Sequence, residues 1–201
     1  MEPKSPARRS SRASSQQKGE ALVRAAREVF ARQGLNVPLD EIAQRAGVSR
    51  TTMRRHFPDR ASLFAAIFEE NVNHLERLLR QIGDAPDAFE KLMAAIIEQQ
   101  AINRGFTELS FYMGYGHPTK EEAVTAFAQS IEESLLRARM IIDEPLRRAK
   151  QAGRVRADVD IDDVELMVMM VGSAVDHGPG IPPSANGQRA LMLLFDGLRP
   201  R

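Results

Sequence analysis

The 201-residue sequence contains no cysteine, and this absence removes several classes of site at once. Without thiols there is no disulfide framework and no thiolate-bound zinc. No uncharged stretch approaches the ~20 residues of a membrane span, and no apolar segment follows the basic N-terminus as a signal peptide requires. The sequence also lacks a metal-spaced His/Asp/Glu cluster, a glycine-rich phosphate loop and a nucleophile-elbow motif. We therefore expect a cytoplasmic, nucleoid-associated protein that is not an enzyme and holds no metal or cofactor.

Charge of both signs is present, but it is distributed unevenly along the chain. Residues 1–60 carry 13 Lys or Arg against 6 Asp or Glu, whereas residues 61–201 carry 15 against 21. The net charge of +1 therefore conceals a basic first third and an acidic remainder. A basic segment of this kind is a candidate binder of polyanions, although uneven charge also arises by chance. The motifs have to decide between the two.

Residues 1–17 have no apolar side chain larger than that of Met1 and are rich in Ser, Arg and Pro. Such a segment cannot bury enough surface to offset its ordering entropy, so we predict a disordered basic arm. Its arginines, Arg8, Arg9 and Arg12, either enter a DNA minor groove or keep a tail solvated, and both interpretations stay open.

Residues 18–65 show the pattern of a DNA-binding domain. Apolar residues recur at helical spacing from Leu22 to Phe30, and a short amphipathic helix follows Pro38. Gly47 then allows the left-handed conformation of a tight turn, and Ser49 can cap a following helix. A helix, a tight turn and a second helix form a helix-turn-helix signature.

The motif that runs from Ile42 to Ser49, followed by Thr52-Met53, by residues 56–60 and by Leu63, resembles the DNA-binding domain of the TetR family. The resemblance covers roughly residues 18–70. It implies an all-α dimeric regulator, usually a repressor, in which a three-helix DNA-binding domain is joined by a long helix to a C-terminal helical bundle. The later part resembles the family in length, helicity and the stretch 153–158.

The third helix would enter the major groove, where short polar side chains near its start approach base edges and basic groups at its margins meet phosphates. Met53 and Phe57 should point into the domain. The predicted DNA-contacting residues are Arg50, Thr51, Thr52, Arg54, Arg55, His56 and Arg60. The alternative for the arginines is a solvated helix face. Thr51 replaces the glycine, and Arg54 the aromatic residue, that are common in the family, so the operator is not predicted.

Residues 66–201 should form the ligand-sensing and dimerisation domain. An amphipathic helix that starts after Asp59 continues into this domain and links the two. Further helices are expected at about 86–102, 105–115, 119–152, 161–176 and 186–198, with a kink or break at Pro145.

Two sets of residues are candidates for sites in this domain. The predicted ligand-facing residues are Phe106, Phe111, Tyr112, Met113, Met140, Met169 and His177, because methionine and aromatic side chains suit an apolar pocket. The competing interpretation is that most of them fill the core. The predicted dimer-interface residues are Val164, Met167, Val168, Val171, Leu191, Leu194 and Phe195, on the last two helices.

Two functions fit these features. The first is a repressor whose dimer binds a palindromic DNA operator and is released by a small, apolar or aromatic effector. The second is a DNA-binding regulator without a small-molecule effector, controlled by a partner protein or by its own abundance. A fully packed C-terminal core would favour the second.

Overall fold

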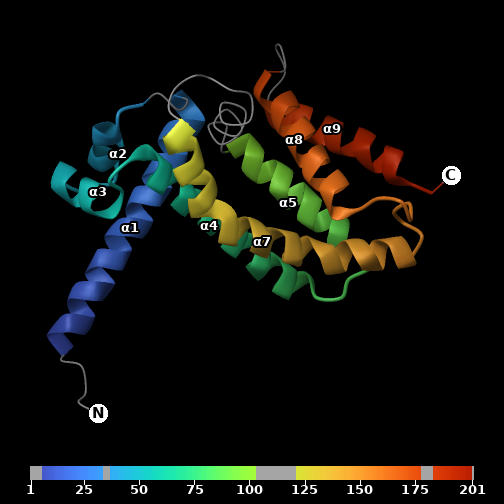
Figure 1. Cartoon of the computed structure of the whole chain (residues 1–201), viewed down its shortest axis with the longest axis horizontal. Helices are drawn as coiled ribbons and strands as arrows, with labels where there is room; N and C mark the ends of the chain where they lie inside the picture. Colours follow the sequence, from blue (N-terminus) through green and yellow to red (C-terminus); the bar gives the residue numbers. More distant parts are fainter. Residues whose placement is uncertain (1–5, 34–36, 103–120, 178–182, 201) are drawn as a thin grey trace.

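The computed structural model describes residues 6–33, 37–102, 121–177 and 183–200. Within these ranges all regular secondary structure is helical, which confirms the predicted fold class. Helices α1 to α3 gather with the start of α4 at one end, and helices α5, α7, α8 and α9 pack together at the other (Figure 1).

The first domain consists of α1 (Pro6–Gln33), α2 (Leu39–Arg45), α3 (Arg50–His56) and the first turns of α4 (Arg60–Ile82). Its core collects the inward faces of all four helices, including the fully buried Leu22, Ile42, Met53, Leu63 and Phe64. The rings of Phe30 and Phe64 stack with centroids 5.0 Å apart, so α1 and α4 are held together at the centre of the domain.

Helix α1 begins at Pro6, whereas the composition predicts a disordered arm over residues 1–17. The difference has a physical reason in helix cooperativity. Residues 18–33 are anchored in the core and form the helix nucleus, which is the unfavourable step of helix formation. Each further turn toward the N-terminus then only extends an existing helix. Alanine, arginine and glutamine, which make up seven of the twelve residues 6–17, propagate a helix readily.

Helix α4 leaves the first domain and continues along the second. At its start Asp59 accepts a hydrogen bond from the Ser62 backbone, and Ser62 Oγ receives one in return from the Asp59 backbone, which forms a capping box. At its end Gly83 adopts a positive φ of 57°. The side chains of Val72 and Leu75 are buried against α5 and α7, so α4 belongs to both domains.

The second domain contains α5 (Ala88–Ile102), α7 (Glu121–Gln151), α8 (Ile161–His177) and α9 (Pro183–Leu198). The expected helices at 86–102, 119–152, 161–176 and 186–198 are present, while the one expected at 105–115 lies outside the described residues. Helix α7 is continuous through Pro145, so the expected break is absent. The Pro145 side chain is buried, and packing of the flanking Ile142 and Leu146 in the core favours a single helix.

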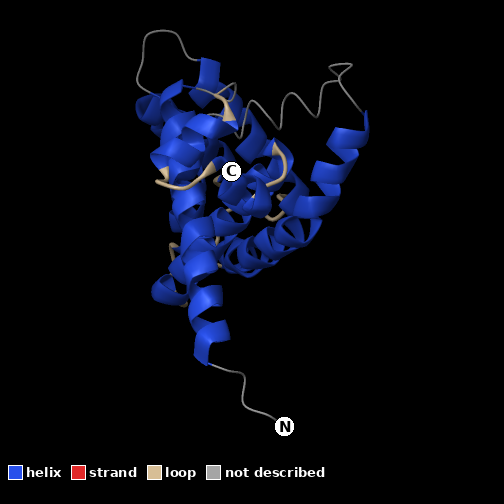
Figure 2. Cartoon of the chain, turned by 90° about the vertical axis from the view of Figure 1, so that its left-hand side faces the viewer, coloured by secondary structure: helices blue, strands red, loops and turns tan. Residues whose placement is uncertain are grey.

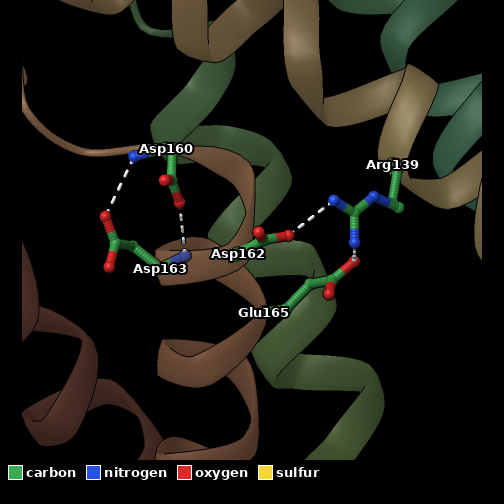
Figure 3. Close-up of polar contacts among 5 residues, drawn as sticks. All are labelled: Arg139, Asp160, Asp162, Asp163 and Glu165. Atoms are coloured by element: carbon green, nitrogen blue, oxygen red, sulfur yellow. Dashed lines mark hydrogen bonds and ion pairs between the residues drawn. The ribbon is translucent and has the colours of Figure 1, made fainter.

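Polar contacts fix the start of α8 (Figure 3). Asp160 and Asp163 exchange backbone-to-carboxylate hydrogen bonds of 3.0 Å, which satisfies donors at the helix start. Arg139 of α7 donates to Asp162 at 2.6 Å and to Glu165 at 2.8 Å. One arginine therefore joins the middle of α7 to the first turns of α8.

Candidate nucleic-acid interface

The short helix α3 is held in place by the turn before it and by two buried side chains. Gly47 has a φ of 68°, which lets the chain reverse between α2 and α3. Ser49 Oγ accepts a hydrogen bond from the Thr52 backbone at 3.1 Å and confirms the predicted cap. Met53 and Phe57 point into the core, as predicted. The opposite side of α3 is consequently turned to solvent.

The exposed side of α3 is polar and cationic. Arg50, Thr51, Arg54 and Arg55 are exposed, and Thr52 is half-buried because its hydroxyl lies 3.0 Å from that of Ser49. Within the described part of the chain, Arg54 and Arg55 have no ion-pair partner. This surface presents hydroxyl and guanidinium donors of the kind that meet base edges and phosphates in a DNA groove.

Two arginines near this surface are engaged by carboxylates in the chain. Arg50 Nε lies 3.2 Å from Asp40 of α2, and both side chains are well exposed. Arg45, also on α2, donates to Glu28 of α1 at 2.8 Å. This hydrogen bond and the positive charge of Arg45 lower the pKa of Glu28. The Arg45 pair ties α2 to α1, whereas the Arg50 pair lies at the start of the candidate DNA-contacting helix.

The other two predicted DNA-contacting residues lie partly inside the domain. His56 is half-buried, and its Nε2 has no hydrogen-bond partner among the described residues. Arg60 donates to the Val37 carbonyl at 2.7 Å, and burial lowers the pKa of its guanidinium, which remains protonated. The structure therefore places Arg60 in a contact that joins α4 to the segment before α2.

The first domain is connected to the rest of the chain by α7 as well as α4. Ile131 of α7 is buried in the same core cluster as the helices of the first domain. Two turns further along, Arg137 donates to Glu76 and to Asn73 of α4, both at 2.7 Å. The hydrogen bond to Glu76 also raises the pKa of Arg137. A displacement of α7 would be transmitted to α4 and to the first domain through these contacts.

The residues predicted to face a ligand are not brought together by the described structure. Phe106, Phe111, Tyr112 and Met113 lie outside the described residues, as does the side chain of His177. Met140 is 76% exposed and Met169 is 60% exposed, on the outer sides of α7 and α8.

The predicted dimer residues divide into two groups. Val164, Met167 and Val171 are buried in the core of their own chain, and the remaining four, Val168, Leu191, Leu194 and Phe195, are half-buried against it. The exposed apolar residues of α8 and α9 are instead Leu166, Met169, Met170, Met192 and Leu193, each 49–60% exposed. We call this set the outer apolar face.

The residues predicted for the dimer interface do not include this face, although the sequence carries a signal for it. Helix α8 carries apolar residues on more than one side, so its periodicity alone does not separate the side that packs inward from the side left exposed. An exposed apolar side on a helix is typical of a surface that packs against a further element, and in the described part of this chain nothing covers it.

Comparison with known families agrees with this arrangement. Residues 22–67 match the family of bacterial regulatory proteins described as the tetR family, and residues 84–200 match the C-terminal domain of SbtR-like transcriptional regulators. The chain belongs to the TetR family of transcriptional regulators. As a TetR-family regulator it is a DNA-binding protein, and the family match at 22–67 contains both α2 and α3.

Relatives of this TetR-family regulator carry related names. The HTH-type transcriptional activator FasR of Mycolicibacterium smegmatis is 35% identical over 83 residues, which represent 40% of this chain and 37% of FasR. The chain spans 37–43% of the length of such curated relatives.

Two solved structures extend the similarity over the whole fold. A TetR regulatory protein from Mycobacterium vanbaalenii is 27% identical, with a TM-score of 0.62 over 94% of this chain and 99% of that one. The fatty acid degradation regulator FadR from Bacillus halodurans is 20% identical, with a TM-score of 0.63 over 100% of both chains. At this identity, the similarity to FadR shows a shared fold and nothing further.

Two further observations bear on other classes of function. In the described ranges no three His, Asp or Glu side chains are grouped so that they could hold a metal ion. Among the described helices, none has both the length and the apolar character to cross a membrane. The family and the relatives are regulators of transcription, and no catalytic activity is indicated for them.

Proposed function

We propose that this TetR-family regulator is a repressor whose homodimer binds a palindromic operator through α3 and is released by a small apolar or aromatic effector. The observation that carries the proposal is the capped, outward-facing α3, on which Arg50, Arg54 and Arg55 are exposed. Thr51 and Arg50 would reach base edges from the helix start, and Arg54 and Arg55 would meet phosphates. Thr52, His56 and Arg60 are the remaining proposed contacts. Binding requires Arg50 to exchange Asp40 for a DNA acceptor, which is an inexpensive step because the pair is exposed.

The homodimer would form through the outer apolar face on α8 and α9. These two helices pack against each other in one chain, since Val171 of α8 lies in a cluster with Leu191 and Leu194 of α9. Pairing of this face with its copy would remove the exposed leucines and methionines from water. A two-fold dimer presents two copies of α3, and a palindrome requires them to lie about one DNA turn, ~34–36 Å, apart.

Release would work through α4. The C-terminal part of α4 is buried against α5 and α7, and its N-terminal turns belong to the core of the DNA-binding domain. A ligand that favours a different packing of α5 and α7 would tilt α4 and change the separation of the two α3 helices. The bonds from Arg137 to Glu76 and Asn73 lie on this route.

The direction of regulation needs its own test, because the relative FasR is named an activator. A repressor operator overlaps the promoter or lies downstream of it, and deletion of the regulator raises transcription of the adjacent gene. Lowered transcription after deletion would replace the proposed repressor by an activator.

The decisive experiment is DNA binding by the purified full chain. Genomic fragments that it retains would define a duplex, and its affinity would be compared with that of a scrambled duplex over a salt series. Arg54→Ala should weaken both duplexes and lower the salt slope by about 2 per dimer, since one phosphate contact is lost per subunit. Thr51→Ala should reduce mainly the preference for the selected sequence. Arg80→Ala, at an exposed position far along α4, is the matched control and should change neither property.

Equal binding of the selected and scrambled duplexes at every salt concentration would contradict the proposed sequence-specific regulator. The effector is tested separately, by release of the bound duplex with a panel of medium-chain fatty acids and aromatic acids. If operator binding is specific and no compound releases it, control by a partner protein or by abundance takes the place of the effector.

A further inference from the structure

Helix α1 extends far beyond the domain that it helps to build. It runs from Pro6 to Gln33, but Leu22 is its first buried residue among those whose burial is described. At 1.5 Å per residue, the residues before Leu22 span about 24 Å of helix. In both views this part of α1 projects away from the body of the molecule toward the N-terminus (Figures 1 and 2). We refer to residues 6–18 as the α1 extension.

The α1 extension leaves the domain beside the end of α3. The contact is close at Gly19, where an added Cβ atom would lie 3.4 Å from Nδ1 of His56, the last residue of α3. The exposed Arg54 and Arg55 lie two residues and one residue before His56 on the same helix. The extension therefore begins at the margin of the candidate DNA interface.

The sequence around the α1 extension is cationic, and no acidic residue balances its positive charge. Residues 3–19 contain no acidic residue, and their cations are Lys4, Arg8, Arg9, Arg12 and Lys18. Helices that stand alone in solvent are usually supported by glutamate–lysine pairs one turn apart, and a basic segment without acids cannot form them. The first turn of α1 also has no acidic residue to offset the positive end of the helix dipole.

Packing does not explain the α1 extension either. Of residues 14–18, none is buried, and Lys18 is exposed. Gln16 donates a side-chain hydrogen bond to Glu20 at 3.1 Å, within the same helix. Propagation from the core accounts for the helix. Its unbalanced positive charge, in turn, favours a polyanion as its partner.

We propose that the α1 extension is a second DNA contact, which lies along backbone phosphates outside the base pairs covered by α3. The proposal rests on the proposed function, because it assumes that α3 is bound to DNA. The recognised group is the phosphodiester, so the extension adds affinity and salt dependence but no sequence preference. It also lengthens the stretch of duplex that each subunit occupies.

The test compares two duplexes that share the operator selected by the full chain. One ends at the limits of the α3 contacts, and the other carries 10 additional base pairs on each side. The variant Arg8→Ala/Arg9→Ala/Arg12→Ala should bind the long duplex 10- to 100-fold more weakly at low salt. Its salt slope on that duplex should fall by up to about 5, because a dimer loses six cations. On the short duplex the variant and the original chain should bind alike.

Two control variants separate charge from helix stability. Arg8→Lys/Arg9→Lys/Arg12→Lys keeps the charge and should retain the salt slope of the original chain. Ser10→Ala/Ser11→Ala/Ser14→Ala keeps all cations and should retain affinity. Thermal unfolding should be the same for all of these proteins, because the substituted positions precede the core.

The outcomes distinguish failure of this inference from failure of the proposed function. Suppose that the original chain prefers the operator, and that the triple alanine variant matches the original chain in affinity and salt slope on the long and the short duplex. The proposed phosphate contact is then overturned, while the proposed function stands. If the triple alanine variant loses preference for the operator over a scrambled sequence, the extension reads bases and the inference is likewise overturned. If the original chain binds neither duplex, both proposals fall.

Discussion

The outer sides of α3 and of α8–α9 both face solvent in the single chain, but their chemistry is opposite. The exposed side of α3 carries hydroxyls and guanidinium groups, whereas the outer apolar face carries leucine and methionine. Among the described residues, every large hydrophobic side chain that is strongly exposed lies on α7, α8 or α9. Water solvates the first surface well and the second poorly. The described part of the first domain therefore has its apolar side chains buried in one chain, while the C-terminal domain leaves an apolar face exposed, through which the proposed homodimer would form.

The two domains also differ in how their cores are closed. The first domain buries Leu22, Ile42 and Met53 inside a single cluster. Among the described residues of the second domain, buried side chains of α5, α7 and α8 pack together with Leu198 of α9.

The largest expected effect comes from a substitution in the buried core of the DNA-binding domain. Phe64 is 2% exposed and stacks on Phe30, so Phe64→Ala should lower the free energy of unfolding by about 3–5 kcal/mol. Urea denaturation followed by circular dichroism measures the loss. Leu193→Ala, at a 56% exposed position, is the comparison and should cost far less under conditions in which the protein is monomeric. Equal losses would mean that Leu193 is packed within its own chain as closely as Phe64.

The next effect concerns the outer apolar face. Leu193→Glu places a charge on this face and should raise the dissociation constant of the homodimer at least about 100-fold, because a carboxylate would be desolvated in the interface. Sedimentation velocity at several concentrations measures this change. Gln81→Glu adds the same charge at an exposed polar position of α4 and should leave the dimer intact. A Leu193→Glu protein that remains dimeric would place the interface elsewhere.

A smaller effect is expected when the N-terminal cap of α3 is removed. Ser49→Ala removes the cap of α3 and should lower the free energy of unfolding by about 1 kcal/mol. Operator affinity should fall as well, since the first turn of α3 carries Arg50 and Thr51. Thr51→Ala, at an exposed position outside the cap, should change stability by less than about 0.5 kcal/mol. If both substitutions cost the same, the cap does not hold the helix.

Loss of a contact between the two domains should have a weaker effect on operator affinity. Arg137→Ala removes the bonds from α7 to Glu76 and Asn73 of α4 and should change operator affinity by about threefold, through the position of α4. Arg147→Ala is the matched control, since Arg147 pairs with Glu144 within α7 itself. Fluorescence anisotropy with the operator duplex measures both. An equal response of the two variants would remove Arg137 from the proposed route.

The smallest effect depends on pH. Arg45 lowers the pKa of Glu28 in the folded state, so this pair stabilises the domain above the ordinary glutamate pKa of 4.5 and loses its contribution as the pH falls through the lowered value. Glu28→Gln should therefore unfold slightly more easily than the original chain at pH 7 and equally easily once Glu28 is protonated. Thermal unfolding between pH 7 and pH 3 tests this. The difference should be small because both side chains are about half-exposed.

Much of the first domain could be predicted from local sequence. Gly47 permits the turn, Ser49 caps α3, and Met53 and Phe57 lie one helical turn apart on one side. Each of these effects acts within a few residues, so the sequence predicts them and the structure confirms them. Arg60 is different, because its partner is the Val37 carbonyl, 23 residues earlier in the chain.

Burial was harder to predict for apolar residues that could lie either in the core of the chain or on an exposed apolar face. Val164 and Leu166 are both apolar and lie two residues apart on α8, but the first is buried in its own chain and the second is 51% exposed. Hydrophobicity alone does not separate a core side from an interface side. Met140 and Met169 illustrate the same ambiguity, since methionine fits a pocket, a core or an interface.

The sequence by itself determined the helical class, the helix-turn-helix and the basic character of the first third, because these follow from periodicity, short-range hydrogen bonding and charge. The tertiary structure decided which side of α8 is left exposed, where α1 begins and how α7 is tied to α4. The reason is that burial and long-range ion pairs depend on which helices become neighbours. That choice is made by the packing of the whole chain, for which no short segment carries the information.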